Sequence, residues 1–252
     1  MITYRDLTAR AEFDAVVDLE RRIWGPGYDD VVPTLILTIT VMRGGILIGA
    51  FDETRMVGFV YSLAGLKNGK PMQWSHMLGV IDECRNDGVG NRLKLLQRDR
   101  ALAMGLDLIE WTFDPMQALN AHLNFTKLGV VVEEYEENVY GESQSPLHRG
   151  NPTDRFVAEW NIREKRMTPD WSGAVRVNRG TDADLSIDAR KVTVEIPTGF
   201  TDMLSRAPDL ALAWRMATRL TFTTYFSRGY RAVDFALDRA ARAGAYLLVS
   251  AA

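Results

Sequence analysis

A pair of glycines between a strand-like run and a helix-like run is the feature that most constrains this chain. The run Trp74 to Val80 resembles a strand and Asn91 to Met104 a helix, and Arg85-Asn86-Asp87-Gly88-Val89-Gly90 stands between them. Glycine permits a tight turn and the close approach of a ligand, and a helix start offers unpaired N–H groups and a positive dipole end. This order predicts a diphosphate-binding loop, although a strand-to-helix turn without a ligand has the same pattern.

Composition narrows the class of protein. The chain has 252 residues, of which 46% are hydrophobic and 25% charged, as in soluble globular proteins. A net charge of -3 disfavours nucleic acid as a partner. The single cysteine, Cys84, excludes an intrachain disulfide, and no Cys/His cluster has metal-ligand spacing, so we expect no metal and a reducing, cytoplasmic location.

The sequence also predicts no membrane partner and no export. The start of the chain lacks the basic and then apolar pattern of a signal peptide. The most apolar run, Val31 to Met42, is too short to span a bilayer and contains Pro33.

Apolar spacing and turn residues predict a mixed α/β fold. A strand, glycine loop, helix and strand form a parallel crossover unit, and this unit follows an antiparallel hairpin, so the sheet should be mixed and largely antiparallel, with flanking helices. The expected elements, in chain order, are a short strand and a helix ending at Trp24, a hairpin of 46–51 and 56–61, a loop with Gly65, Gly69 and Pro71, a strand at 74–80, a helix over 91–104, a strand at 108–113, a helix at 117–128, strands at 130–135 and 155–162, a turn-rich segment over 163–190, a strand at 192–197, a helix at 209–226, and strands at 230–237 and 246–250.

Two finer predictions concern helix faces and repetition. Val89, Leu93, Leu96 and Ala103 can line one buried face of the helix after the loop. The helix-Gly-strand pattern ending at Gly129 is echoed by the pattern ending at Gly229. The echo fits a degenerate half-repeat, but such junctions are common and chance similarity explains it more simply.

Two motifs in order resemble the GNAT acyltransferase superfamily, whose members bind acyl-coenzyme A. They are Arg85-x-x-Gly88-x-Gly90, after a strand ending in His76-Met77-Leu78-Gly79-Val80, and Asn120-Ala121-His122-Leu123-Asn124-Phe125-Thr126-Lys127-Leu128-Gly129. The resemblance covers roughly the first 160 residues by order of elements. Trp111 to Pro115, Pro152 to Arg155 and Glu159-Trp160 are similar to a longer, poorly characterised GNAT branch with a C-terminal region.

The resemblance implies an acyl-CoA site around the glycine loop. Backbone amides from Asp87 to Asn91 would hold the pyrophosphate, while the strand edge around Leu78 and Val80 would pair with the pantetheine arm and polarise the thioester carbonyl. Asn120, Asn124 and Lys127 are spaced to share a helix face toward the cofactor, although Lys127 equally fits a solvated lysine. The cofactor-binding set is Leu78, Val80, Arg85, Asp87, Gly88, Val89, Gly90, Asn91, Asn120 and Lys127.

Direct attack by an amine needs a base if the amine arrives protonated. The candidate catalytic residues are Glu110, His76 and Asp114. Each has a structural alternative: Glu110 a buried partner such as an arginine, His76 a hydrogen-bonded core position, and Asp114 a cap of the helix that follows.

Other residues are candidates for the general acid and for contacts to the acceptor amine. Phe125 stands where many relatives have a tyrosine that protonates the leaving thiolate, so water, another group, or Tyr135 or Tyr140 would act instead. Trp24, Asp154 and Arg155 are the predicted acceptor contacts, although a structural ion pair explains Asp154-Arg155 more simply.

These observations predict a GNAT-like domain over residues 1–162 and a C-terminal extension over residues 163–252, which is a half-repeat, a dimer element or a substrate element. The predicted reaction is transfer of an acetyl or other short acyl group, such as succinyl, from acyl-CoA to the amine of a small molecule, an amino acid being one candidate. A homodimer is one expected form. The rival class is a non-catalytic acyl-CoA-binding module, and a nucleotide-binding protein is disfavoured because no Lys-Ser/Thr follows Gly90.

Overall fold

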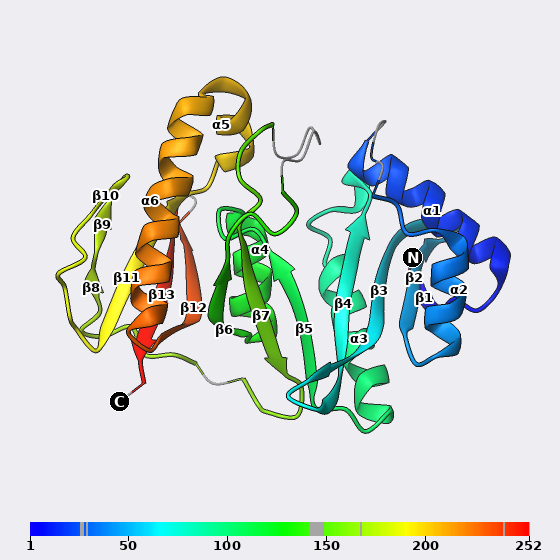
Figure 1. Ribbon diagram of the computed structural model, residues 1–252. Coiled ribbons are helices and arrows are strands. Elements are labelled where there is room, and N and C mark those ends of the chain that lie inside the picture. The colour runs from blue at the N-terminus through cyan, green and yellow to red at the C-terminus, as the bar shows by residue number, and fades with distance from the viewer. Residues whose placement is uncertain (26–27, 29, 142–148, 167, 239, 252) are drawn as a thin grey trace. The chain divides into compact units, whose positions relative to one another are not determined.

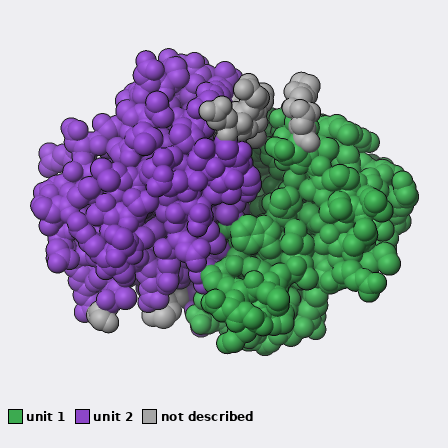
Figure 2. Space-filling view, viewed as in Figure 1, with its two compact units in different colours: residues 1–111, 161–164 green, residues 112–160, 165–252 purple. Residues whose placement is uncertain are grey.

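The structure, a computed structural model, describes every residue except 26–27, 29, 142–148, 167, 239 and 252. The chain forms two compact units, coloured green and purple in Figure 2. Unit 1 comprises Met1–Trp111 and Asn161–Glu164, and unit 2 comprises Thr112–Trp160 and Lys165–Ala252. This division by contacts differs from the predicted boundary after residue 162, which stays a prediction about domains.

Unit 1 is built on a sheet in the order β1-β2-β3-β4-β5, with antiparallel neighbours except for the parallel pair β4 and β5 (Figure 1). Its elements are β1 (Ile2–Asp6), α1 (Arg10–Trp24), α2 (Thr34–Met42), β2 (Ile46–Asp52), β3 (Arg55–Lys67), β4 (Lys70–Val80), the 3₁₀ turn η1 (Asp82–Cys84), α3 (Val89–Ala103) and most of β5 (Leu108–Phe113). The predicted mixed, largely antiparallel α/β fold is confirmed.

Helices α1 and α3 cover opposite faces of this sheet. A Cβ added at Gly79 would meet Ile23 and Trp24 of α1, at 2.8 and 3.3 Å. One added at Gly90, at the start of α3, would approach Leu78 and Val80 at 3.7 and 3.9 Å. Successive strand residues point to opposite faces, so β4 directs Gly79 to α1 and its neighbours to α3.

Two predictions for unit 1 need correction, and one helix was not predicted. The expected loop with Gly65, Gly69 and Pro71 is a continuous hairpin, because β3 runs to Lys67 and β4 begins at Lys70. The apolar run to Met42 forms the short helix α2. On α3 the buried face includes Lys94 and Gln97 in addition to Val89, Leu93 and Ala101, while Leu96 and Ala103 are not buried.

In unit 2 the sheet has the strand order β7-β6-β12-β13-β11-β8, antiparallel except at β11 and β8. Helix α6 packs against it over β6, β11 and β12, and is the long orange helix in Figure 1. The elements are α4 (Ala118–Ala121), the π-helical η2 (His122–Leu128), β6 (Val131–Glu136), β7 (Arg155–Asn161), β8 (Val175–Arg176), β9 (Asn178–Arg179), β10 (Asp182–Ala183), β11 (Lys191–Pro197), α5 (Phe200–Arg206), α6 (Pro208–Ser227), β12 (Tyr230–Asp238) and β13 (Ala243–Ser250). Helix α5 and the three short strands within 163–190 were not predicted from the sequence.

One aromatic cluster forms the core of unit 2. The ring of Phe156 lies 4.7 Å from Phe222, 5.4 Å from Tyr246 and 5.7 Å from both Phe113 and Tyr135. Edge-on ring contacts of this kind stabilise beyond the apolar area that they bury. Residues 112–160 and the C-terminal segment therefore share one core.

The two helix-Gly-strand segments of unit 2 share the same backbone features at the same offsets from their glycines. Gly129 and Gly229 both have left-handed backbones, with φ of 77° and 81°. β6 pairs with β12 at Val132 and Ala232, each three residues after its glycine. A register shift follows Val132 against β7 and Ala232 against β13, again at the same offset. The half-repeat stays a prediction, and these equal offsets favour it over chance similarity.

Candidate functional site

A bulge in β4 sets the position of His76. Tyr61 pairs with Met77 and the next residue, Ser62, pairs with Ser75, so His76 is the extra residue of β4. Such bulges redirect side chains and often lie beside active sites. His76 is exposed, and its ring meets the edge of Tyr61 at 6.0 Å. The protein around the imidazole partly desolvates it and lowers its pKa, so His76 is neutral at pH 7 and can accept a proton.

The glycine loop presents an open helix start after β4. Gly88 caps α3 with φ of 80°, and no atom lies within 4 Å of a Cβ built there. Asp87 and Gly88 are exposed, whereas Gly90 and Asn91 are half-buried and the Val89 side chain is buried. The Oδ1 atom of Asn91 is buried without a hydrogen-bond partner. Free N–H groups of the first turn and open space in front of them fit an anionic group.

Arg85 turns back onto the protein. Its Nε donates to the carbonyl of Val80 at 3.1 Å, and its guanidinium pairs with Asp82 at 2.6 Å. The side chain is half exposed and Asp82 largely exposed, so the ion pair is weak and screened by solvent. In this arrangement Arg85 braces the end of β4, and a role in binding phosphate would require it to leave Asp82.

The two glycines predict separable effects on stability and binding. Gly88→Ala places a side chain in left-handed backbone and should lower the free energy of unfolding by about 1–2 kcal/mol. Gly90→Ala meets only ordinary contacts and should leave stability unchanged. Its methyl group would stand before Leu78 and Val80, where the pantetheine arm is predicted, and should weaken coenzyme A binding about tenfold. Urea unfolding measures the stability of both variants, and calorimetry measures their affinity for coenzyme A. Equal coenzyme A affinity in wild type and Gly90→Ala would contradict the predicted position of the pantetheine arm.

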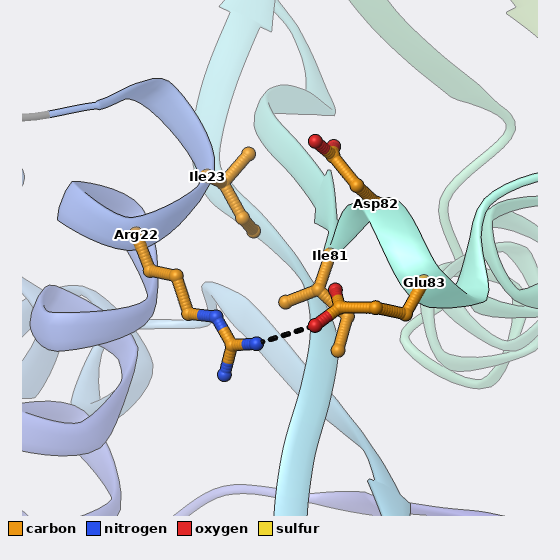
Figure 3. A pocket seen from close by; sticks show the side chains of 5 residues that line it. All are labelled: Arg22, Ile23, Ile81, Asp82 and Glu83. Carbon is orange, nitrogen blue, oxygen red and sulfur yellow. Dashed lines mark hydrogen bonds and ion pairs between the residues drawn. The ribbon is translucent and has the colours of Figure 1, made fainter.

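Beside the loop lies an open pocket of about 270 Å³ in unit 1, shown in Figure 3. Its lining comes from the end of α1 and from the turn after β4: Arg22, Ile23, Ile81, Asp82 and Glu83. Arg22 pairs with Glu83 at 2.8 Å, and Arg55 approaches the same carboxylate at 3.4 Å. Because both cations already face a carboxylate and Asp82 adds a second one, this pocket is a poor site for a phosphate.

Glu110 on β5 is 5% exposed and forms an ion pair with Lys67 of β3. The sequence suggested a buried cationic partner such as an arginine, and the cation is a lysine.

Lys94 lies buried with its Nζ 3.5 Å from the Trp111 ring centroid, and it donates to Ser75 at 2.9 Å and Gln97 at 3.0 Å. Burial lowers the pKa of Lys94 well below its usual value.

Asp114 is held by an arginine from α6. Arg215 donates to both carboxylate oxygens at 2.8 Å, and the Met116 N–H donates to Oδ1 at 2.8 Å. Burial alone would raise the pKa of Asp114, but the charge and hydrogen bonds of Arg215 hold it below its ordinary value. A carboxylate stabilised in this way is a poor base. Its bond to the Met116 N–H lies in the turn before α4, whose N-cap is Gln117, so Asp114 does not cap this helix as the sequence suggested.

Asp154 is fully buried and pairs with Arg219 rather than with Arg155. Arg219 donates to its oxygens at 2.9 and 2.7 Å, and the Tyr135 hydroxyl donates at 2.6 Å. The structural ion pair suggested by the sequence thus exists, but with a different partner. Arg155 donates to the Asp154 carbonyl and lies over the Tyr140 ring at 5.0 Å.

The predicted polar face of the second motif is not formed. Asn120 and Lys127 are exposed, but Asn124 is 4% exposed and lies inside unit 2. Asn124 lies in the π-helical turn over His122–Leu128, where its side chain is buried.

Phe125 is fully buried, with its ring 5.6 Å from Tyr246 and 6.2 Å from Phe113. Of the alternatives, Tyr135 is bound to Asp154, and burial with that charge raises its pKa far above 10. Tyr140 is 55% exposed, and its hydroxyl lies 3.0 Å from Oγ1 of Thr112 at the end of β5. Tyr140 is therefore the more accessible of the two phenols.

A buried carboxyl on α1 was not among the residues predicted from the sequence. Glu20 is fully buried; its Oε2 accepts the Val32 N–H at 2.9 Å, and its Oε1 has no hydrogen-bond partner. Burial raises the pKa of Glu20 to about 7, against the opposing hydrogen bond and the charge of Arg21. Trp24, a predicted acceptor contact on the same helix, stacks on Tyr28 at 5.3 Å and meets Phe59 edge-on at 6.1 Å.

Glu20 predicts a pH-dependent stability. The folded state holds this proton up to pH of about 7, whereas the unfolded state releases it near pH 4.5, so the free energy of unfolding should fall as pH rises between these values. In Glu20→Gln the free energy of unfolding should no longer fall over this pH range. At pH 8 it should exceed the wild-type value by about 2 kcal/mol. Urea unfolding at pH 5 and pH 8 measures the effect. The control is Asp18→Asn, on the exposed face of α1; an unchanged slope in Glu20→Gln would refute the assignment.

Other missed residues carried a readable signal. Arg215 and Arg219 are one helical turn apart within the apolar run Ala211 to Phe222. Lys94 stands in the same way on the apolar side of α3. Charges inside an apolar helix predict buried partners, although not which ones.

Two features are absent from the described part of the chain. No three His, Cys, Asp or Glu side chains there come together in a way that could hold a metal ion. No helix among those residues has the length and apolar character needed to cross a membrane.

Comparison with known proteins shows a likeness in fold. No protein-family model and no curated protein sequence matches this chain. The protein yncA from Salmonella typhimurium, solved with its cofactor acetyl-CoA, superposes with a TM-score of 0.54 at 15% identity, covering 68% of this chain and 98% of that one. The ribosomal-protein-S18-alanine N-acetyltransferase from Escherichia coli superposes with a TM-score of 0.52 at 14% identity, covering 68% of this chain and 97% of that one. Aminoglycoside 6'-acetyltransferase type Ii superposes with a TM-score of 0.51 at 19% identity, covering 66% of this chain and 99% of that one. Other solved structures of similar fold are acetyltransferases of the GNAT family.

Proposed function

We propose that this chain, which has the fold of the GNAT acetyltransferases, is an acyl-CoA-dependent N-acyltransferase. It would transfer an acetyl or other short acyl group, such as succinyl, to the amine of a small molecule, an amino acid being one candidate. The observation that carries the proposal is the bulged strand β4 leading into the open glycine start of α3, because that order supplies amides for a diphosphate beside a strand edge.

In unit 1 the donor would bind through backbone groups. The N–H groups from Gly88 to Asn91 would receive the pyrophosphate, and the edge of β4 at Leu78 to Val80 would pair with the pantetheine amides. An N–H near Leu78 would stabilise negative charge as it develops on the thioester carbonyl. The acetyl-CoA of the yncA structure supports the choice of donor.

His76 is the proposed base. It is exposed, neutral at pH 7 and placed by the bulge. Arg215 holds the pKa of Asp114 below its ordinary value, so that carboxylate is a poor base, and Glu110 is already engaged in an ion pair with Lys67. The amine would lose its proton to His76 and attack the carbonyl carbon directly, and coenzyme A would leave as the thiol after protonation.

In unit 2, Asn120 stays the proposed amide contact to the donor because it is the exposed asparagine of the second motif. Tyr140 is the proposed proton donor to the thiolate, since its exposed hydroxyl is available. Arg155, over the Tyr140 ring, and Trp24 stay proposed acceptor contacts. Buried Asp154 would act only through its neighbours. A cytoplasmic location and a homodimer also remain proposals.

The decisive experiment is turnover. The protein, incubated with acetyl-CoA or succinyl-CoA and a panel of small amines including amino acids, should release free thiol and form the acylated amine. Binding without thiol release across the panel would favour a non-catalytic acyl-CoA-binding module, which the buried, hydroxyl-free Phe125 also fits. Calorimetry with coenzyme A, ATP and NAD tests the donor; preference for a nucleotide other than coenzyme A would refute the proposal.

A further inference from the structure

Helix α3 carries a buried polar cluster against the sheet of unit 1. Lys94 is 2% exposed and Gln97 is fully buried. The Nζ atom of Lys94 donates to Oγ of Ser75 on β4 and to Oε1 of Gln97. The same Nζ lies 3.5 Å from the ring centroid of Trp111 on β5. One ammonium group therefore contacts both β4 and β5 from the α3 side of the sheet.

The cluster lies where β4 and β5 stop pairing. In unit 1 the paired residues of these two strands are Gln73 with Ile109 and Trp74 with Glu110. Ser75 and Trp111 are the next residues along the strands, and they do not pair with each other. Ser75 therefore begins the stretch of β4, continuing to Leu78 and Val80, whose edge is proposed to receive the donor.

The cluster contains a hydrogen-bond donor that has no acceptor. Because the Lys94 ammonium group can only donate, the Gln97 amide must turn its oxygen toward Nζ and its nitrogen away. That nitrogen, Nε2, is buried without a hydrogen-bond partner. A buried donor of this kind is costly to leave unpaired, and an anionic acceptor would remove the cost. Burial lowers the pKa of Lys94, and a neighbouring anion would oppose this effect.

The proposed position of the donor directs its acyl group toward this cluster. The pyrophosphate would lie at the start of α3 and the pantetheine arm along Val80 to Leu78, so the acyl group would extend along β4 toward Ser75. Pairing with β3 gives the length: Leu78 lies opposite Val60 and Ser75 opposite Ser62, two residues apart, which is about 7 Å of strand. An extended four-carbon acyl group followed by one hydrogen bond covers about that distance.

We propose that Lys94 and Gln97 select an acyl group that ends in a carboxylate, so that the donor is succinyl-CoA or another dicarboxylic acyl-CoA of similar length. The inference rests on the proposed function and deepens it, because it names the acyl class that the same site takes. Glu110 does not oppose an anion there. It points to the opposite face of β5 from its neighbour Trp111, and it is paired with Lys67.

The test compares succinyl-CoA with butyryl-CoA, whose acyl group has the same four carbons and no charge. Calorimetry with the full-length wild-type chain should give a dissociation constant for succinyl-CoA about 10-fold to 100-fold lower than for butyryl-CoA. Lys94→Met keeps the length of the side chain without its charge. In this variant the two dissociation constants should become equal, while the value for butyryl-CoA stays near that of the wild type. Because the substitution removes a buried charge, urea unfolding should show no loss of stability.

The matched control is Lys70→Met, which makes the same exchange at the exposed start of β4 and should change neither dissociation constant. If Lys94→Met does not fold, Lys94→Gln provides the same comparison. Equal affinity of the wild type for succinyl-CoA and butyryl-CoA, or a preference for succinyl-CoA that survives the loss of Lys94, would overturn this inference alone. A wild-type chain that binds no acyl-CoA would instead overturn the proposed function, and this inference with it.

Discussion

Replacing His76 with glutamine should lower kcat for acyl transfer about 100-fold to 10,000-fold at pH 7, while the KM for acyl-CoA changes little. Glutamine preserves the size and hydrogen bonding of the side chain but cannot accept the proton of the amine. The bulge in β4 and the edge contact with Tyr61 hold the imidazole in place, so the substitution removes the base and leaves its surroundings intact.

The pH profile provides the sharper measurement. Only neutral His76 can act as a base, so wild-type kcat should fall as pH drops through its pKa, which partial desolvation by the surrounding protein places below the ordinary histidine value of 6.5. His76→Gln should lose this acid limb. Glu110→Gln, the matched change at the competing candidate, should retain it. Full activity with an unchanged acid limb in His76→Gln would assign the base elsewhere.

Replacing Phe156 with alanine should lower the free energy of unfolding by about 3–5 kcal/mol. The side chain is fully buried and contacts rings from both 112–160 and the C-terminal segment, so its loss leaves a cavity that neither part can fill. Phe156→Leu keeps an apolar side chain in that space and should cost about 1 kcal/mol. Urea unfolding gives both values.

Hydrogen exchange tests whether this core is shared. In Phe156→Ala, protection should fall together in β6 and β7 and in β12 and β13, because one aromatic cluster supports all four strands. Loss confined to β6 and β7, or a stability loss below about 1 kcal/mol, would show that the C-terminal segment folds separately.

Local patterns predicted most elements because hydrophobic periodicity and glycine positions act over a few residues. The strand Leu108–Phe113 agrees with its prediction, and the helix before Gly229 agrees within a residue. The errors lie where tertiary packing overrides local preference. The hairpin joining β3 and β4 continues through Gly65 and Pro71, since neighbouring strands pair there, and Asn124, expected on a polar helix face, is buried in unit 2.

The sequence by itself determined the GNAT-like order of elements, the glycine loop and the chemical types of the candidate residues, because motif spacing and periodicity are local properties. Only the tertiary structure decided which charges meet. Asp114 lies 101 residues from Arg215, and Asp154 lies 65 residues from Arg219, so no local pattern could pair them. The lowered pKa of His76 is likewise a tertiary effect, since the partial desolvation that causes it depends on residues that pack around the imidazole from other elements.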